Sequence, residues 1–114
     1  MRLTVVAIRH HPRGRIYEVT VDGKTVSILF TFHALDRIAR WGLTDRKVLQ
    51  ALLVPEEVLL GHRSRFIAHR RSGGHVVRVV YQYEGEMPVL ITVYYPFARR
   101  YFQGGRTHED HIFS

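Results

Sequence analysis

Apolar and polar residues alternate along most of the first 30 positions of the chain. This spacing is typical of β-strands with one buried face, and it predicts strands over residues 3–9, 16–21 and 25–30. The gaps have turn chemistry, because His11-Pro12-Arg13-Gly14 lies in the first and Asp22-Gly23 is a strong hairpin signal in the second. The N-terminal part is therefore predicted to be a β-hairpin that extends into a meander.

The spacing then changes to a helical period. We expect a first helix over about residues 31–41, with Gly42 at its C-terminal cap. Thr44 and Asp45 suit the start of a second helix, and Pro55 ends it because the residue before a proline avoids the helical region. The first helix carries an apolar stripe of Phe32, Leu35, Ile38 and Ala39, and the second is expected to bury Val48, Leu49, Leu52 and Leu53.

The rest of the chain again reads as extended structure. A short segment at residues 57–60 precedes strands predicted over residues 65–71, 76–83 and 89–95. This order predicts an α+β fold, with two helices packed on one face of a mainly antiparallel twisted sheet. The chain has 114 residues, which is enough for one domain with its own core. We expect a single domain over residues 1–114, with N-terminal strands over residues 1–30.

The predicted strand register brings polar side chains onto one face of the sheet. A two-residue turn between the first two C-terminal strands would place His69 opposite Arg78. The hydrophobic pattern of the next hairpin favours a register that turns Ile91 and Val93 toward the core and Tyr94 toward Arg78. The opposite, polar face would then carry Arg65, His69, Arg78, Gln82, Thr92 and Tyr94.

Charge and composition narrow the class of partner. The formal net charge is +7, and only two of the 17 Lys and Arg residues are lysine. Such a balance favours phosphate groups or an acidic protein as a partner, and it also keeps a protein soluble. There is no cysteine, and no apolar run is long enough to span a membrane. We expect a soluble, cytoplasmic protein without membrane contacts.

Two groups of residues suit phosphodiester chemistry. His33 and Arg37 lie one helical turn apart, and Arg40 follows one turn later. Metal-free RNA cleavage needs a proton acceptor, a proton donor and a cation for the developing phosphate charge, which His69, Arg78 and Tyr94 could supply together. In the alternative interpretation, the polar face is only solvated and His33 fixes the start of its helix.

Metal and cofactor chemistry are not indicated by the motifs. His10 and His11 are adjacent, and His108 and His111 do not have the spacing of two zinc ligands four residues apart on a helix. There is no glycine-rich phosphate loop and no serine elbow motif. We therefore expect no metal site and no cofactor.

Several short motifs in the second part of the chain form a recognisable series. They are Phe32 with Arg37, Gly42-Leu43-Thr44, Pro55-Glu56-Glu57-Val58, Arg78-Val79-Val80-Tyr81, Thr92-Val93-Tyr94 and Arg100-Tyr101-Phe102, followed by Gly104-Gly105 and Glu109-Asp110. Over residues 30–112 their order resembles a bacterial and archaeal family of domains of unknown function. That family is grouped with RelE-like and BrnT-like toxins of the barnase/colicin/RelE ribonuclease-like fold.

The resemblance implies a RelE-like core over residues 31–112 that includes a C-terminal tail. It also implies metal-free endoribonuclease activity restrained by an antitoxin, with matching positions at His33, Arg37, Arg78 and Tyr94. The strands over residues 1–30 are additional to the family pattern, and they would extend the sheet, cover an edge or mediate dimerisation.

Two functional hypotheses follow. The first is a toxin-type, metal-independent endoribonuclease that acts on free or ribosome-bound RNA, with an acidic antitoxin and a second copy of the chain as further partners. The second is a non-catalytic module that binds nucleic acid or protein, or a degenerate toxin relative. The candidate catalytic residues are His33, His69, Arg78 and Tyr94, and the candidate RNA-binding residues are Arg37, Arg40, Arg65 and Arg71.

Overall fold

The computed structural model describes residues 2–102 and 104 and shows a mixed α/β fold built on a seven-stranded sheet. The sheet has the order β1-β2-β3-β7-β6-β5-β4, and its neighbouring strands are antiparallel except for the parallel pair β3 and β7. The strands are β1 (Leu3–His11), β2 (Gly14–Val21), β3 (Lys24–Thr31), β4 (Glu57–Leu60), β5 (Phe66–Ser72), β6 (His75–Glu84) and β7 (Met87–Tyr94). The helices are α1 (Phe32–Arg40), α2 (Asp45–Leu53) and the short α3 (Ala98–Tyr101).

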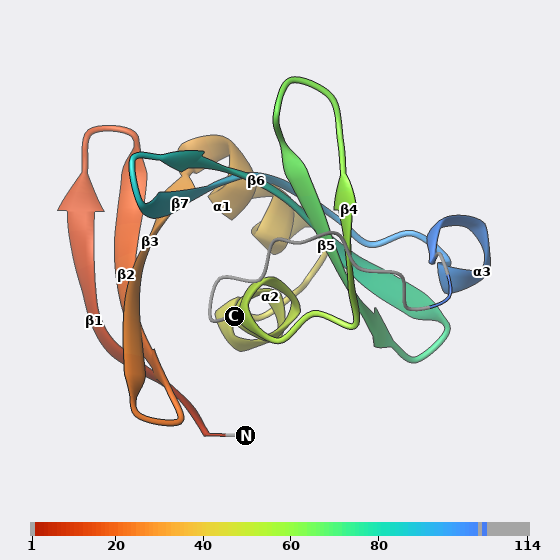
Figure 1. Ribbon diagram of the computed structural model, residues 1–114, viewed down its shortest axis with the longest axis horizontal. Helices are drawn as coiled ribbons and strands as arrows, with labels where there is room; N and C mark the ends of the chain where they lie inside the picture. The colour runs from red at the N-terminus through yellow and green to blue at the C-terminus, as the bar shows by residue number, and fades with distance from the viewer. Residues whose placement is uncertain (1, 103, 105–114) are drawn as a thin grey trace.

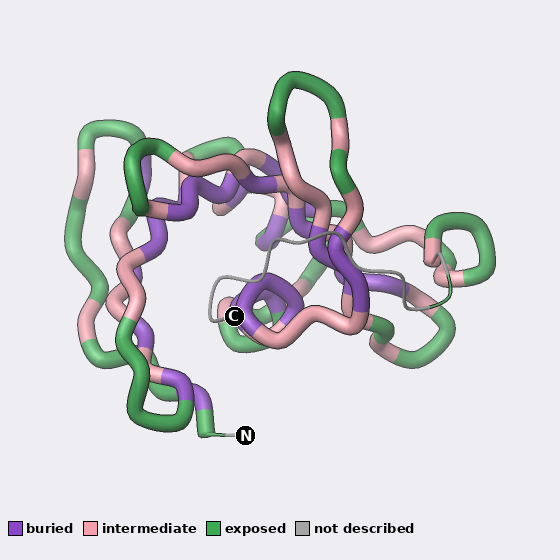
Figure 2. Tube along the Cα trace, viewed as in Figure 1, coloured by how far each residue is buried: buried purple, intermediate pink, exposed green. Residues whose placement is uncertain are grey.

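The sheet curves around α2, which lies in its hollow (Figure 1). Thr44 caps this helix by accepting a hydrogen bond from the backbone N–H of Lys47, as the sequence predicts. Its buried residues join those of β2, β3, β5, β6 and β7 in one apolar core, which forms the purple band around α2 in Figure 2. The helix buries Val48, Leu49, Ala51, Leu52 and Leu53.

The first helix lies in a different position, beside the edge of β7 beyond the end of β3. The Thr31 hydroxyl, which caps α1, donates a hydrogen bond to the carbonyl of Leu90 (2.8 Å). At the other end of α1, the Trp41 indole N–H donates to the carbonyl of Val93 (3.0 Å). The predicted packing of two helices on one sheet face is therefore confirmed only in part. No helix in the described part of the chain is long and apolar enough to cross a membrane.

This edge position changes which side of α1 is buried. Ala34 and Ile38 contribute to the core, whereas Phe32 is 60% exposed and Ala39 is also exposed. The predicted apolar stripe was thus wrong at Phe32 and Ala39, because α1 contacts an edge and does not lie flat on the sheet. Leu35 is half-buried against the core.

The predicted register of the C-terminal strands is confirmed around Arg78. Arg78 pairs with His69 on β5 and with Tyr94 on β7. A β-bulge interrupts the ladder just beyond Val80, so Leu90 is the buried residue and Ile91 is only half-buried. The prediction that Ile91 faces the core was therefore wrong, since one extra residue on β7 reverses the alternation from that point.

Gly14, at the start of β2, lies opposite Thr31, the residue that caps α1. It pairs with Thr31 across β2 and β3, and its φ is +156°. A Cβ atom at this position would lie 1.8 Å from the backbone oxygen of Phe30. Only glycine fits this approach of two strands.

We predict that Gly14→Ala lowers the free energy of unfolding by about 3 kcal/mol or more, because the new methyl group collides with backbone that cannot move independently. Gly23→Ala is the matched control, since Gly23 also has a positive φ (+86°) but no atom within 4 Å of the added Cβ. Its expected loss is about 1 kcal/mol. Chemical denaturation measures both, and equal losses would contradict the steric explanation.

Candidate functional site

Three strands place a polar cluster on the face of the sheet that lies opposite α2, which we call the outer face. Ala68, Val79 and Val93 belong to the core around α2, so their neighbours along each strand point to the other side. Those neighbours are His69, Arg78 and Tyr94. The structure therefore brings together three of the four predicted catalytic residues, side by side across β5, β6 and β7.

A fully buried carboxylate from β4 completes this cluster. The Glu57 Oε2 atom lies 2.6 Å from Nδ1 of His69, and both side chains are 0% exposed. The Nη1 atom of Arg78 lies 2.9 Å from Nε2 of His69. A guanidinium group can only donate, so Nε2 must accept and the ring proton must reside on Nδ1, where it is donated to Glu57. We call this arrangement the Glu57–His69–Arg78 network.

The network holds the imidazole in its neutral form. Burial lowers the pKa of His69, and the nearby charge of Arg78 lowers it further, while Glu57 opposes both effects. Both ring nitrogens are engaged and the ring is inaccessible, which does not favour the predicted acid–base role of His69. Its geometry instead suits a positioning residue that orients the guanidinium of Arg78.

Arg78 faces an aromatic pocket at the surface. The pocket has a volume of about 330 Å³, and the Arg78 guanidinium lies 5.1 Å from the ring centre of Tyr101 on α3. Trp41 and Tyr94 are each more than 40% exposed there, so their rings are accessible to a ligand. A cation among flat aromatic rings suits a ligand that has both a phosphate and a base. The lining residues are Trp41, Arg78, Tyr94, Tyr95, Pro96 and Tyr101.

The fourth predicted catalytic residue, His33, reaches the same face from the start of α1. Its Nε2 atom lies 3.1 Å from the hydroxyl oxygen of Thr92, which is two residues before Tyr94 on β7. His33 is exposed, in contrast to His69. Of the two predicted histidines, His33 is therefore the one that solvent and a ligand can reach.

The predicted RNA-binding arginines of α1 differ in how much of their charge is free. Arg40 forms an ion pair with Asp36 (2.9 Å), as the i, i+4 spacing predicts. Arg37 lies 4.0 Å from the same carboxylate, at the limit of an ion pair. Arg37 therefore keeps more of its charge available for a phosphate than Arg40 does.

The other two predicted RNA-binding arginines lie on β5 or just before it. Arg65 donates to the side-chain oxygen of Gln82 at 3.4 Å. Arg71 forms an ion pair with Glu56 (2.9 Å) and lies over the Phe102 ring. The hydrogen bonds from Arg71 lower the pKa of Glu56. The side chain of Arg71 therefore connects β5 to Glu56, the residue before β4, and part of its charge is neutralised there.

Sequence reasoning missed Glu57 and Trp41 as members of this site. The available signal for Glu57 was an acidic residue in a short apolar strand, which has to find a buried partner. No group of three or more potential metal-ligating side chains occurs among the described residues. His108 and His111, whose spacing does not suit two zinc ligands, lie outside those residues.

Comparison with known proteins gives one family match. The model of a domain of unknown function, DUF4258, matches residues 30–95, which is more than half of the chain. The matched range contains the whole Glu57–His69–Arg78 network and Tyr94, and it ends before α3. No curated protein and no solved structure matches the chain.

The lowered pKa of His69 predicts a loss of stability in mild acid. The unfolded state binds a proton at about pH 6.5 and the folded state only at lower pH, so the stabilisation is complete above about pH 6.5 and is lost as the pH falls through the folded pKa. Chemical denaturation between about pH 7 and 5 should show a smaller decline in His69→Gln, which cannot titrate.

The position of the ring proton on Nδ1 of His69 can be checked without a substitution. Long-range ¹H–¹⁵N correlation spectra of the unmodified protein at neutral pH should show a protonated Nδ1 and an unprotonated Nε2 for His69. A doubly protonated ring under these conditions would contradict the network as described.

Proposed function

This chain belongs to the DUF4258 family, and we propose that it is a metal-independent endoribonuclease of the toxin–antitoxin type. The main support for the proposal is the position of the Arg78 guanidinium. It donates a hydrogen bond to the buried His69, which is itself bonded to Glu57, and it faces the exposed aromatic pocket. Such a cation is preorganised for the negative charge of a phosphodiester in its transition state.

Single-stranded RNA fits the chemistry of the aromatic pocket. A base can stack on the exposed rings of Trp41, Tyr94 or Tyr101, and the adjoining phosphate can accept from Arg78. Among the described residues, His69 accepts a hydrogen bond from one nitrogen of Arg78, and the other N–H groups of the guanidinium can donate to phosphate oxygens. The net charge of +7 adds a general attraction to nucleic acid.

In the proposed reaction the 2′-hydroxyl oxygen attacks the adjacent phosphorus and the bond to the 5′-oxygen breaks. His33 takes the proton from the 2′-hydroxyl, and the hydroxyl of Tyr94 gives a proton to the leaving oxygen. Arg78 stabilises the additional charge on the phosphorus oxygens. His33 is accessible beside Thr92, about 7 Å along β7 from Tyr94, so the two groups can flank one phosphate.

The partners of this type of protein include an acidic antitoxin, and β1 is the surface that best suits one. It is the first strand of the sheet, so one side of its backbone has no neighbouring strand in the described part of the chain. Val6 and Ile8 on this strand are 61% and 52% exposed. An extended segment of a partner chain could add to this edge by strand pairing.

A second candidate function is RNA binding without cleavage. It is favoured by the engagement of both His69 nitrogens, and none of the six described residues that line the aromatic pocket is a histidine or a carboxylic acid. In this case the affinity would depend on salt, but the RNA would remain intact.

The proposed function predicts cleavage of labelled single-stranded RNA in the presence of a chelator, with cyclic phosphate and 5′-hydroxyl ends. Arg78→Lys should lower the rate by about 10²–10³ because it loses the hydrogen bond to His69 and its fixed orientation. His33→Ala should lower it by about 10²–10⁴ through loss of the proton acceptor.

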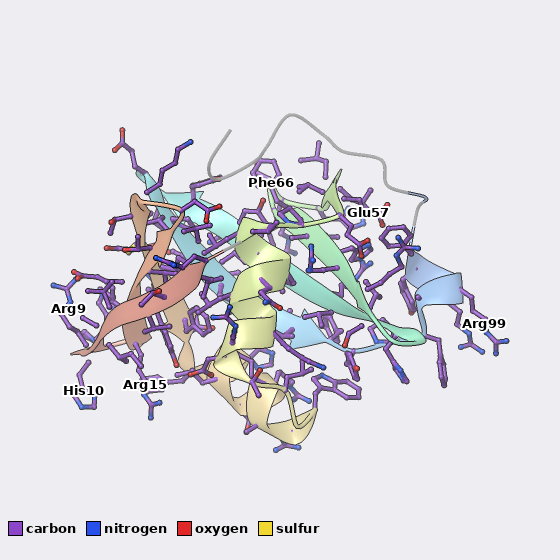
Figure 3. All side chains as sticks on the ribbon, turned by 90° about the horizontal axis from the view of Figure 1, so that it is seen from below. Arg9, His10, Arg15, Glu57, Phe66 and Arg99 are labelled. Carbon is purple, nitrogen blue, oxygen red and sulfur yellow. The ribbon has the colours of Figure 1, made fainter. Side chains whose placement is uncertain are left out.

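Arg15→Ala is the matched control, because it removes one exposed positive charge at the end of the molecule away from Glu57 and α3 (Figure 3). Its cleavage rate should equal that of the unmodified protein. Binding without cleavage would support the second candidate function, and an absence of both would reject each of them.

A further inference from the structure

A second pocket, which we call the basic pocket, lies on the outer face at the turn between β4 and β5. Its volume is about 430 Å³. Two arginines and a histidine contribute to its wall, and its apolar lining comes from β5 and β6. None of the described residues that line it is acidic. They are Gly61, His62, Arg63, Arg65, Ile67 and Val80.

The basic pocket adjoins the aromatic pocket along the same strands. Ile67 pairs with Val80, and the next pair on this face is His69 with Arg78. Val80, in the basic pocket, is therefore only two residues along β6 from Arg78, in the aromatic pocket, which is about 7 Å. The apolar side chains of Ile67 and Val80 therefore lie next to the His69–Arg78 pair on the same face of the sheet.

The turn that carries the basic pocket has a defined but unfavourable backbone. The N–H of Arg65 donates to the carbonyl of His62 (3.2 Å), and both residues between them, Arg63 and Ser64, have a φ of 59°. Glycine and asparagine are the usual residues in such a turn. Arginine at this position is unfavourable for the backbone, yet it supplies a guanidinium group to the wall of the basic pocket.

We propose that the basic pocket is a second phosphate subsite for the same RNA strand that binds at Arg78. This inference rests on the proposed function and specifies its substrate as an oligonucleotide. Arg65 is held near Gln82, which is four residues along β6 from Arg78, or about 13 Å. A stacked strand advances about 3.4 Å per nucleotide and an unstacked strand advances more, so the two phosphates are about two to four nucleotides apart.

The substitution Arg63→Gly tests this subsite without a risk to folding. Glycine removes the guanidinium group and suits the positive φ, so the variant should be at least as stable as the unmodified protein. Ser64→Gly is the matched control, because it makes the same backbone change in the same turn and removes no charge. Arg65→Gln, which keeps an amide donor for Gln82, is combined with Arg63→Gly in a double variant.

Binding is measured by fluorescence anisotropy with labelled RNA of about eight nucleotides and with a labelled dinucleotide. For the longer RNA, we expect Arg63→Gly to weaken binding about tenfold. The slope of log K against log salt should decrease by about 0.7 in this variant and by about 1.4 in the double variant. Dinucleotide binding should be unchanged in both, and Ser64→Gly should match the unmodified protein with both ligands.

The outcomes separate this inference from the proposed function. If Arg78→Ala weakens the binding of both RNAs while the double variant binds the longer RNA normally, the second subsite is wrong and the proposed function remains. If the unmodified protein binds neither RNA, the proposed function itself is wrong. Equal weakening of both RNAs by Arg63→Gly would show a general charge effect and would also overturn the subsite.

Discussion

The hydrogen bond between the buried Glu57 carboxylate and the His69 imidazole is the interaction on which the outer face depends. A carboxylate that is 0% exposed is costly to bury unless it is hydrogen-bonded and near a positive charge. His69 supplies the hydrogen bond, and Arg78 supplies the charge through the other side of the ring. Breaking a buried pair of this kind typically costs about 3–5 kcal/mol, so the three side chains stabilise one another as a unit.

The topology of the sheet explains how this network can lie beside an accessible pocket. Helix α2 fills the hollow of the sheet, and no long helix of residues 2–102 covers the outer face (Figure 1). At one end, α3 and the residue after it bring Tyr101 over Arg78 and the Phe102 ring to 6.5 Å from the His69 ring. Helix α1 lies beside β7 and contributes His33 to the same surface, and Trp41, just after α1, lines the aromatic pocket together with Tyr101. The buried part of the site therefore comes from the sheet, whereas its accessible part combines Tyr94 of the sheet with residues of α1 and α3 or next to them.

The sequence was sufficient to predict the contact between His69, Arg78 and Tyr94. The Gly73-Gly74 turn defines the register of β5 and β6, and the alternation of apolar residues selects the face. Glu57 could not be placed in this way, because the turn between β4 and β5 contains Arg63 and Ser64 where a recognisable turn would contain glycine or asparagine. The bulge that buries Leu90 also has no signal in the local pattern.

The polar face that the sequence predicts lies outside the hollow of the sheet, and the reason is physical. The sheet curves around its apolar face, against which α2 packs. The polar residues therefore lie on the opposite face of the sheet. On that side the Phe102 ring, just after α3, lies near the His69 ring, and His69 is buried while Tyr94 is 43% exposed. The consequence for function is that the histidine nearest to Arg78 orients it, and the accessible histidine comes from α1.

The most direct measurement of the central claim is a structure of the protein with a non-cleavable, 2′-O-methylated single-stranded RNA. The account predicts a phosphate oxygen within hydrogen-bond distance of the Arg78 guanidinium and a base stacked on Trp41, Tyr94 or Tyr101. It also predicts that His69 keeps its contacts with Glu57 and Arg78 and does not touch the RNA. An RNA bound on another surface, or an Arg78 side chain that leaves His69 and turns away from the phosphate, would contradict it.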